Sequence, residues 1–456
     1  MAKKYFIYVF SSLFIFFSEL GSGFTSFNAS FVFNQGFVNI ANLKLIEFVV
    51  AGSYICLLST KKASANLLKR ERTYAIAFIC LLICLLIVEF FLHDSVNISD
   101  WRNVLVGIII FHIFSLTLTT EESIISFLKF FIIALGIKSA IGLGAYLVGH
   151  GVVSPRGSVP FFWDSKQVDA FSYASIILTS YIASYKDIKP NLRIIKMSAA
   201  ILILFIFLIT ILLSIRRTIW VITFLGIIAA LILSNRINVK HYIIGIFAAF
   251  TLSVIILAAP QFEKIRDKLS VYVVSMNLFD DKISKSIDND VHIDNLEKYT
   301  QIISDNPSIF MFGYRGYSGS EYKNLPQKYS DKYPLGVAHN GVLRSIYFFG
   351  IGGVIIFILF VLDASTKYFK IKSYNDNYLM KHVAIASILW LFLSFFASLF
   401  YIPPFWTTFK GVFYTFIAIY FIRSGIYYYN SNTSSDDPIE ELTPDTGTKF
   451  NECKLR

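Results

Sequence analysis

Long apolar runs, separated by short polar segments, make up most of this chain. The run "IKMSAAILILFIFLITILLS" at residues 195–214 is typical, because apolar side chains would surround the whole circumference of a helix formed there. A helix of about 20 apolar residues is long enough to cross the hydrocarbon core of a bilayer, and one that is apolar on every side must be buried or face lipid. The pattern predicts an all-α, polytopic membrane protein with twelve transmembrane helices. The predicted spans are 5–20, 43–60, 73–92, 103–120, 124–148, 167–185, 195–214, 218–235, 241–259, 342–363, 382–402 and 407–424.

The composition agrees with this pattern. Hydrophobic residues form 55% of the chain, aromatic residues 17% and charged residues only 16%, and the mean hydropathy is +0.61. A soluble protein carries charge on about a quarter of its residues. We therefore interpret the net charge of +11 as charge that sets the membrane topology. The sequence lacks the basic and aromatic groove of a nucleic-acid-binding protein, so no nucleic-acid partner is predicted.

The cations of the short loops fall on one side of the predicted helices. Positive charge accumulates in cytoplasmic loops, so this side is predicted to face the cytoplasm. An even number of spans then places both termini there as well. The cations lie before the first span and after the second, sixth, eighth and tenth: Lys3, Lys4, Lys61, Lys62, Lys69, Arg70, Arg72, Lys186, Lys189, Arg193, Lys196, Arg236, Lys240, Lys367, Lys370, Lys372 and Lys381.

Two adjacent arginines depart from this distribution. Arg216 and Arg217, in "LLSIRRTIWVITF", lie between the seventh and eighth predicted spans, on the predicted outer side. One interpretation is that both side chains reach up to lipid headgroups. A pair of permanent cations at the water–membrane boundary is better suited to holding an anion, and phosphate is the anion that matches the guanidinium group. The pair therefore predicts an anion site at the outer surface.

One loop is far longer than the others. Residues 260–341 form a large predicted outer loop between spans nine and ten. Spans one to nine lie within residues 1–259, and spans ten to twelve lie within residues 342–424. In "EKIRDKLSVYVVSMNLF" and "HIDNLEKYTQIISDNP" the apolar positions share one helical face, which predicts helices lying on the membrane, the second ending at Asn306-Pro307. The glycine-rich "GYRGYSGS" follows. The polar tail 425–456 is predicted to be disordered.

The segment "GVAHNGVLRSIYFFGIGGVIIF" joins this loop to the tenth span and carries the best candidate for catalysis. A role as a helix cap or turn residue is enough to explain Asn340. It does not explain why a histidine stands at position 339. An imidazole titrates near neutral pH, and His339 is a candidate general base for a sugar hydroxyl at the membrane surface. Arg344 lies at the outer end of the same span and could join a phosphate site.

The order of these motifs resembles the O-antigen ligase/polymerase superfamily, which contains the Wzy-type polymerases and WaaL-type ligases. The resemblance covers about residues 150–355. Arg-Arg-x-x-Trp comes first, an outer loop with Asn-Pro and a glycine turn follows, and His-Asn-x-x-Leu and Gly-x-x-Gly end it. The matching residues are Arg216, Arg217, Trp220, Asn306, Pro307, Gly313, Gly316, His339, Asn340, Leu343, Gly350 and Gly353. The earlier loop "SPRGSVPFFWDSKQVDAFSYA" is similar to a further arginine loop of that family, with Arg156 as the matching arginine. Two positions depart from the family pattern, Gln167 and His292.

The resemblance implies a GT-C-like glycosyltransferase of the bacterial inner membrane, with its active site on the periplasmic face. Its donor and acceptor would be undecaprenyl-diphosphate-linked oligosaccharides, with no metal or other cofactor, and a chain-length regulator is an implied protein partner. By the same resemblance, Arg216, Arg217 and Arg156 would bind the diphosphate and His339 would be the catalytic base. Asn340, Arg315, Tyr314, Arg344 and Trp220 are possible substrate contacts. A single displacement with one base predicts inversion at the anomeric carbon.

Three alternatives remain open at the level of sequence. A ligase would transfer the finished glycan to lipid A-core with the same residues. A flippase or transporter for lipid-linked oligosaccharides would use charges near the middle of the membrane, for which Glu89 and Lys138 are the candidates. A metal-dependent enzyme could use "DNDVHID", where Asp288, Asp290, His292 and Asp294 alternate, although a solvated acidic loop also explains that pattern.

Overall fold

Helices form nearly all of the chain that the computed structural model describes, which confirms the all-α class. The described residues are 2–16, 39–40, 43–58, 69–93, 102–147, 152–154, 157–159, 165–183, 190–214, 217–233, 299–313, 341–372, 379–397 and 409–433.

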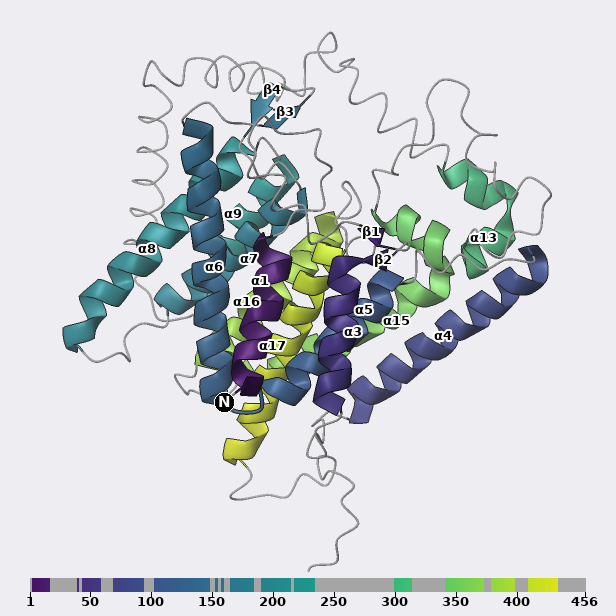
Figure 1. Ribbon diagram of the computed structural model, residues 1–456, viewed down its shortest axis with the longest axis horizontal. Helices are drawn as coiled ribbons and strands as arrows, with labels where there is room; N and C mark the ends of the chain where they lie inside the picture. The colour runs from purple at the N-terminus through teal and green to yellow at the C-terminus, as the bar shows by residue number, and fades with distance from the viewer. Residues whose placement is uncertain are drawn as a thin grey trace, which may run out of the picture.

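Eleven of the twelve predicted apolar segments coincide with a helix, and the remaining one, 241–259, lies outside the described residues. Figure 1 shows these helices as one bundle. They are α1 (Ala2–Phe16), α3 (Leu45–Leu58), α4 (Lys69–His93), α5 (Arg102–Thr117), α6 (Glu121–Leu147), α7 (Ser165–Ala183), α8 (Pro190–Leu213), α9 (Arg217–Leu233), α15 (Gly341–Lys372), α16 (Leu379–Ala397) and α17 (Phe409–Thr433).

Two small β-hairpins and one short helix were not predicted. β1 (Asn39–Ile40) pairs antiparallel with β2 (Leu43–Lys44), and β3 (Val152–Ser154) pairs with β4 (Gly157–Val159). Helix α13 (Pro307–Phe312) follows the helical stretch 299–305. The predicted helix of "HIDNLEKYTQIISDNP" does end at Asn306. However, Pro307 then starts a new helix, because its fixed φ and missing N–H suit the first helical position.

The C-terminal helix is longer than predicted. We expected span twelve to end at residue 424 and a disordered tail to follow, but α17 continues to Thr433. The beginning of the predicted tail, up to that residue, is therefore helical. Its composition misled the prediction, because polar residues can extend a helix beyond its apolar part without any cost of burial.

Helix α7 lies at the centre of the bundle and packs against α8, α9 and α16. Its side chains from Val168 to Ser180 are all buried. Many of them are small or carry a hydroxyl: Ala170, Ser172, Ala174, Ser175, Thr179 and Ser180. Small residues let helix backbones approach closely, and hydroxyl groups form hydrogen bonds between helices. Both features allow helices to associate where the hydrophobic effect does not drive them together.

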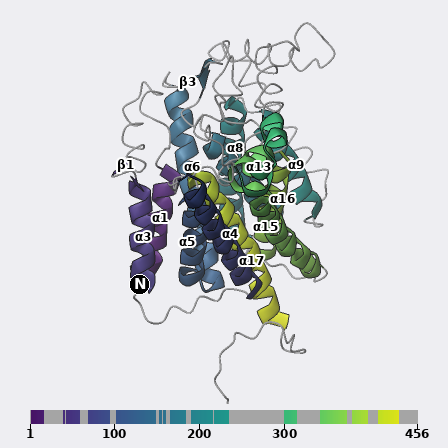
Figure 2. The same ribbon diagram turned by 90° about the vertical axis from the view of Figure 1, so that its right-hand side faces the viewer.

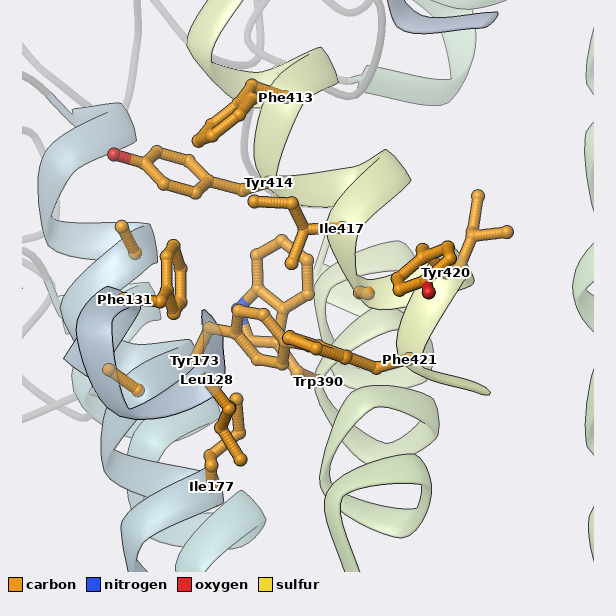
Figure 3. Packing of buried hydrophobic residues seen from close by; sticks show 14 of the residues in the cluster. Leu128, Phe131, Tyr173, Ile177, Trp390, Phe413, Tyr414, Ile417, Tyr420 and Phe421 are labelled. Atoms are coloured by element: carbon orange, nitrogen blue, oxygen red, sulfur yellow. The ribbon is translucent and has the colours of Figure 1, made fainter. Parts of the chain in front are cut away.

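Aromatic side chains fill the space between α6, α7, α16 and α17. The Tyr173 ring stacks on that of Trp390, with 4.7 Å between centroids, and the Phe131 ring packs against both Tyr173 and Tyr414 at 6.2 Å. The Tyr173 hydroxyl forms a hydrogen bond of 2.6 Å with the Ser387 hydroxyl. Figure 3 shows these rings between the helices. The core therefore joins helices far apart in the sequence.

The described helices also expose many large apolar side chains. On α4 these include Ile76, Ile83, Ile87, Phe90 and Phe91. By length and composition alone, two described segments, Glu121–Gly144 and Met380–Ala397, suffice to cross a membrane, and the other apolar helical segments are shorter, with 10–17 residues.

The two ends of the bundle differ. The N-terminus and the end of α17 lie at the lower end in both views, and hairpin β3–β4 and helix α13 lie toward the upper end (Figures 1 and 2).

Candidate functional site

Hairpin β3–β4 frames one predicted phosphate ligand. Its register pairs Val152 with Val159 and Ser154 with Gly157. Arg156 belongs to the two-residue connection between the strands, which lies outside the described residues. The hairpin precedes α7 in the chain and lies toward the upper end of the bundle (Figure 1).

Helix α9 begins at the same end of the bundle as α7. The Thr223 hydroxyl donates a hydrogen bond of 2.8 Å to the Ser172 hydroxyl. One turn further along both helices, Gly226 packs directly against the Ile176 side chain, where a methyl group would overlap it. The two contacts follow in the same order on both helices, so α7 and α9 run parallel and in step. The first residue of α9, Arg217, is therefore level with the first turn of α7.

The connection between α8 and α9 is held by a tryptophan. The Trp220 Nε1–H, in the first turn of α9, donates a hydrogen bond of 2.8 Å to the Ile211 carbonyl in the last turn of α8. That carbonyl also accepts from the Ser214 hydroxyl at 2.6 Å and from the Ser214 backbone N–H at 3.2 Å. The last carbonyls of a helix have no partner within it, and here side chains supply one. Trp220 is a possible substrate contact by the resemblance, and its N–H is used to close this turn.

Helix α15 is broken near its start. Gly350 has φ +67° and ψ 178°, which is not helical, so the first turns are a separate piece from the rest. A positive φ favours glycine strongly. The backbone of α13 packs against this break, so that a methyl group on Gly350 would overlap the Met311 carbonyl and lie 2.9 Å from the Phe312 nitrogen. The predicted Gly-x-x-Gly segment therefore begins with a kink at Gly350, and the backbone of α13 packs against this kink.

The stretch 299–313 is fixed to that first piece of α15. The Tyr299 ring packs edge-on against the Tyr347 ring, with 5.2 Å between centroids, and Ile302 and Ile309 are buried. The Asn306 side chain donates a hydrogen bond of 2.9 Å to the Ile302 carbonyl and ends the first helix. Residues 299–313 thus support the segment that directly follows His339 and Asn340.

The structure describes the predicted site residues only in part. Arg217 and Arg344 lie in α9 and α15, and Trp220 is half-buried in α9. Outside the described residues lie Arg156, Arg216, Asp288, Asp290, His292, Asp294, Tyr314, Arg315, His339 and Asn340. Among the described residues, no group of three or more His, Cys, Asp or Glu side chains is placed to hold a metal ion.

The described core contains buried ionisable side chains. Asp169 in α7 and Arg423 in α17 are both buried and were not singled out from the sequence. The Arg423 guanidinium donates a hydrogen bond of 3.1 Å to the Ser115 hydroxyl. The sequence signal was a charge within an apolar run, and such a charge is rarely without function in a membrane.

Lys138 and Glu89, the candidates for a transport path, are also buried. The Lys138 ammonium donates to the Ile15 carbonyl, in the last turn of α1. A cation at the C-terminal end of a helix is favoured by the helix dipole. A structural role in ending α1 therefore accounts for Lys138.

Comparison of the sequence with protein families and with curated proteins finds no match for this chain. The resemblance to the O-antigen ligase/polymerase superfamily thus rests on the motifs in the sequence, and membership stays a prediction.

Proposed function

We propose that this chain is a polymerase of a bacterial surface polysaccharide, a multi-pass glycosyltransferase of the inner membrane. It transfers a growing glycan from undecaprenyl diphosphate to the sugar of a new undecaprenyl-diphosphate-linked repeat unit. One observation carries the proposal: hairpin β3–β4, on either side of Arg156, and α13, beside the Gly350 kink of α15, lie toward the same end of the bundle (Figures 1 and 2), and α9 begins at Arg217 level with the first turn of α7. Motif residues from distant parts of the chain would thereby meet at one membrane surface.

The helical bundle supports the proposed membrane location. Eleven described helices follow the predicted apolar runs, and their outer faces carry large exposed apolar side chains on α4, α6, α8, α9, α15 and α16. Such surfaces are rare in soluble monomers, and a surrounding hydrocarbon phase removes the cost of exposing them. Twelve spans, with both termini in the cytoplasm, are the topology that we propose.

In the proposed reaction the acceptor hydroxyl attacks the anomeric carbon of the donor glycan. His339 accepts the hydroxyl proton as the new C–O bond forms, and the bond from the anomeric carbon to the diphosphate oxygen breaks. Negative charge grows on the departing undecaprenyl diphosphate, and fixed cations stabilise it. Arg216, Arg217 and Arg156 supply these cations, since the guanidinium fork matches phosphate oxygens. One displacement inverts the anomeric centre.

The test is the length of the glycan on cells that lack the native gene and carry a plasmid copy. We expect His339→Ala and Arg217→Ala to abolish the ladder of long glycans and leave a single repeat unit. Arg193→Ala, which changes an arginine in the first turn of the preceding helix α8, serves as a matched control and leaves the ladder normal. Protein abundance in the membrane is measured for each variant.

Each other outcome identifies a different function. Bare lipid A-core without any repeat unit would indicate the ligase. Normal ladders from His339→Ala and Arg217→Ala, at normal protein abundance, would reject the assigned roles. Purified protein in detergent should convert short lipid-linked glycans into longer ones, and failure with an active donor preparation would favour a transporter.

A further inference from the structure

The described outer segment 299–313 changes its surface character at Asn306. Before this residue the exposed side chains are polar: Thr300, Gln301, Ser304 and Asp305. After it, α13 exposes three consecutive large apolar side chains, with exposed fractions of 40% for Phe310, 53% for Met311 and 45% for Phe312. One half of the segment is suited to water, and the other half is not.

The position of α13 explains why these side chains are not in the core. Ile309 is buried, and the Met311 backbone lies against the Gly350 kink, so α13 already packs against α15 on one side. Phe310, Met311 and Phe312 extend from the rest of its circumference. A cluster of exposed large apolar side chains at one place marks an interaction surface.

The helices next to α13 in the bundle also expose large apolar side chains. Beyond the kink, α15 exposes Ile355, Leu359 and Leu362, which share one helical face by their spacing. Helix α4 crosses α15 there, with the Leu81 side chain 3.5 Å from the position of a methyl group on Gly352. From this crossing α4 continues and exposes Ile83, Ile87, Phe90 and Phe91. Both views place α13 at the upper part of α15 (Figures 1 and 2).

We propose that Phe310, Met311 and Phe312 insert into the surface of the outer leaflet, so that the partner of this patch is the phospholipid bilayer itself. The inference rests on the proposed function for the membrane location of the bundle and for the side on which α13 lies. Helix α13 packs against α15, and α15 packs against α4. All three helices expose large apolar side chains, and lipid as the occupant accounts for all of these exposed side chains together. The sequence predicts that the helix before Asn306 lies on the membrane, but its apolar residues Tyr299 and Ile302 are buried, with the Tyr299 ring against Tyr347 of α15. The change at Asn306 therefore sets the depth: residues 299–305 stay in water and α13 enters the headgroup region.

The test measures the surroundings of single cysteines in the full chain. Cys56, Cys80, Cys84 and Cys453 are first replaced by serine, and Met311→Cys is then labelled with an environment-sensitive fluorophore. The protein is reconstituted in nanodiscs of phosphatidylethanolamine and phosphatidylglycerol, without any other protein. The matched control is Ser304→Cys, an exposed position in the polar half of the same segment. Phe312→Cys provides a second position in the patch, should Met311→Cys reduce the yield of folded protein.

We expect labels at residues 311 and 312 to emit at shorter wavelength than the label at residue 304. Spin labels attached near the lipid headgroup should quench them at least twofold more strongly than they quench residue 304, which a water-soluble quencher should reach best. Equal emission and equal quenching at the three positions would overturn the proposal. A patch that binds another protein would give this negative result, since the nanodisc contains none. The readout requires no glycosyl transfer, so an inactive enzyme with an inserted patch would reject only the proposed reaction.

Discussion

The Ile211 carbonyl explains why a tryptophan ends the Arg-Arg-x-x-Trp motif. The Ile211 carbonyl accepts hydrogen bonds from the Ser214 hydroxyl and from the Trp220 indole N–H. Because Trp220 lies in the first turn of α9, its bond fixes where α9 starts relative to the end of α8. Arg217 is the first residue of that helix, so the tryptophan sets the position of a proposed phosphate ligand.

We predict that Trp220→Phe weakens this turn by about 1 kcal/mol, since it removes one hydrogen bond and keeps an aromatic ring. Ser214→Ala, which removes the other side-chain donor, should have an effect of similar size. The double variant should lose more than the sum of the two, because the buried carbonyl then keeps only a long backbone bond. Thermal unfolding in detergent measures the loss. Strictly additive effects would show that the two donors do not share a function.

The sequence indicates the residue types of the proposed site but not their partners. The motif spacing singled out Trp220, yet it could not reveal a bond to a carbonyl nine residues earlier, since that bond depends on how tightly α8 and α9 are joined. Asp169 was overlooked because it lies near the start of the predicted span 167–185, where a carboxylate can still reach water, and only the packing of α7 shows that it is buried. Eleven helices were predictable for the opposite reason: the length of an apolar run is a local property of the sequence.

At the scale of elements, the break in α15 is the feature that the sequence could not show. Two nearby glycines, Gly350 and Gly353, looked alike in the sequence, but only Gly350 has a positive φ. The kink separates the first piece of α15 from the rest, and α13 occupies the space that the kink creates. Since His339 lies two residues before α15, this junction is how residues 299–313 would influence the proposed catalytic base.

We predict that Gly350→Ala destabilises the protein by about 1–3 kcal/mol, because the new side chain requires a strained φ and overlaps the Met311 carbonyl. Gly352→Ala is the matched control, since its methyl group would meet only the Leu81 side chain, at an ordinary contact distance of 3.5 Å. Thermal unfolding of both variants measures the difference. The proposed function further predicts shorter glycan ladders for Gly350→Ala alone. Equal stability of the two variants would contradict the importance of the kink.

Helix packing gives a second prediction at this scale. Gly107 on α5 lies where α17 approaches, and a methyl group there would overlap the Val412 and Phe416 side chains. We predict that Gly107→Val lowers stability by about 1–3 kcal/mol through overpacking. Gly52→Val on α3 is the control for the lower helix propensity of valine, because nothing lies within 4 Å of that position. If Gly52→Val were as harmful in thermal unfolding, propensity rather than packing would be the cause.

At the scale of the whole molecule, the two ends of the bundle must face two different compartments if the proposed function is right. The end that carries hairpin β3–β4 and α13 would be periplasmic, because undecaprenyl-diphosphate-linked repeat units are polymerised there. The end with the N-terminus and the last turn of α17 would be cytoplasmic (Figure 1). The short connection at residues 118–120, between α5 and α6, also belongs to the cytoplasmic end in the proposed topology.

Two exposed residues at opposite ends make this topology testable. Thr120 lies in the connection between α5 and α6, and Ser304 lies in the outer segment 299–313. In the cysteine-free background, we predict that a membrane-impermeant maleimide labels Ser304→Cys in intact spheroplasts. Thr120→Cys should react only after the membrane is permeabilised, and a permeant maleimide should label both. If Ser304→Cys reacted only after permeabilisation, the arginines at the start of α9 would face the cytosol, where no periplasmic glycan could reach them, and the proposed function would be rejected.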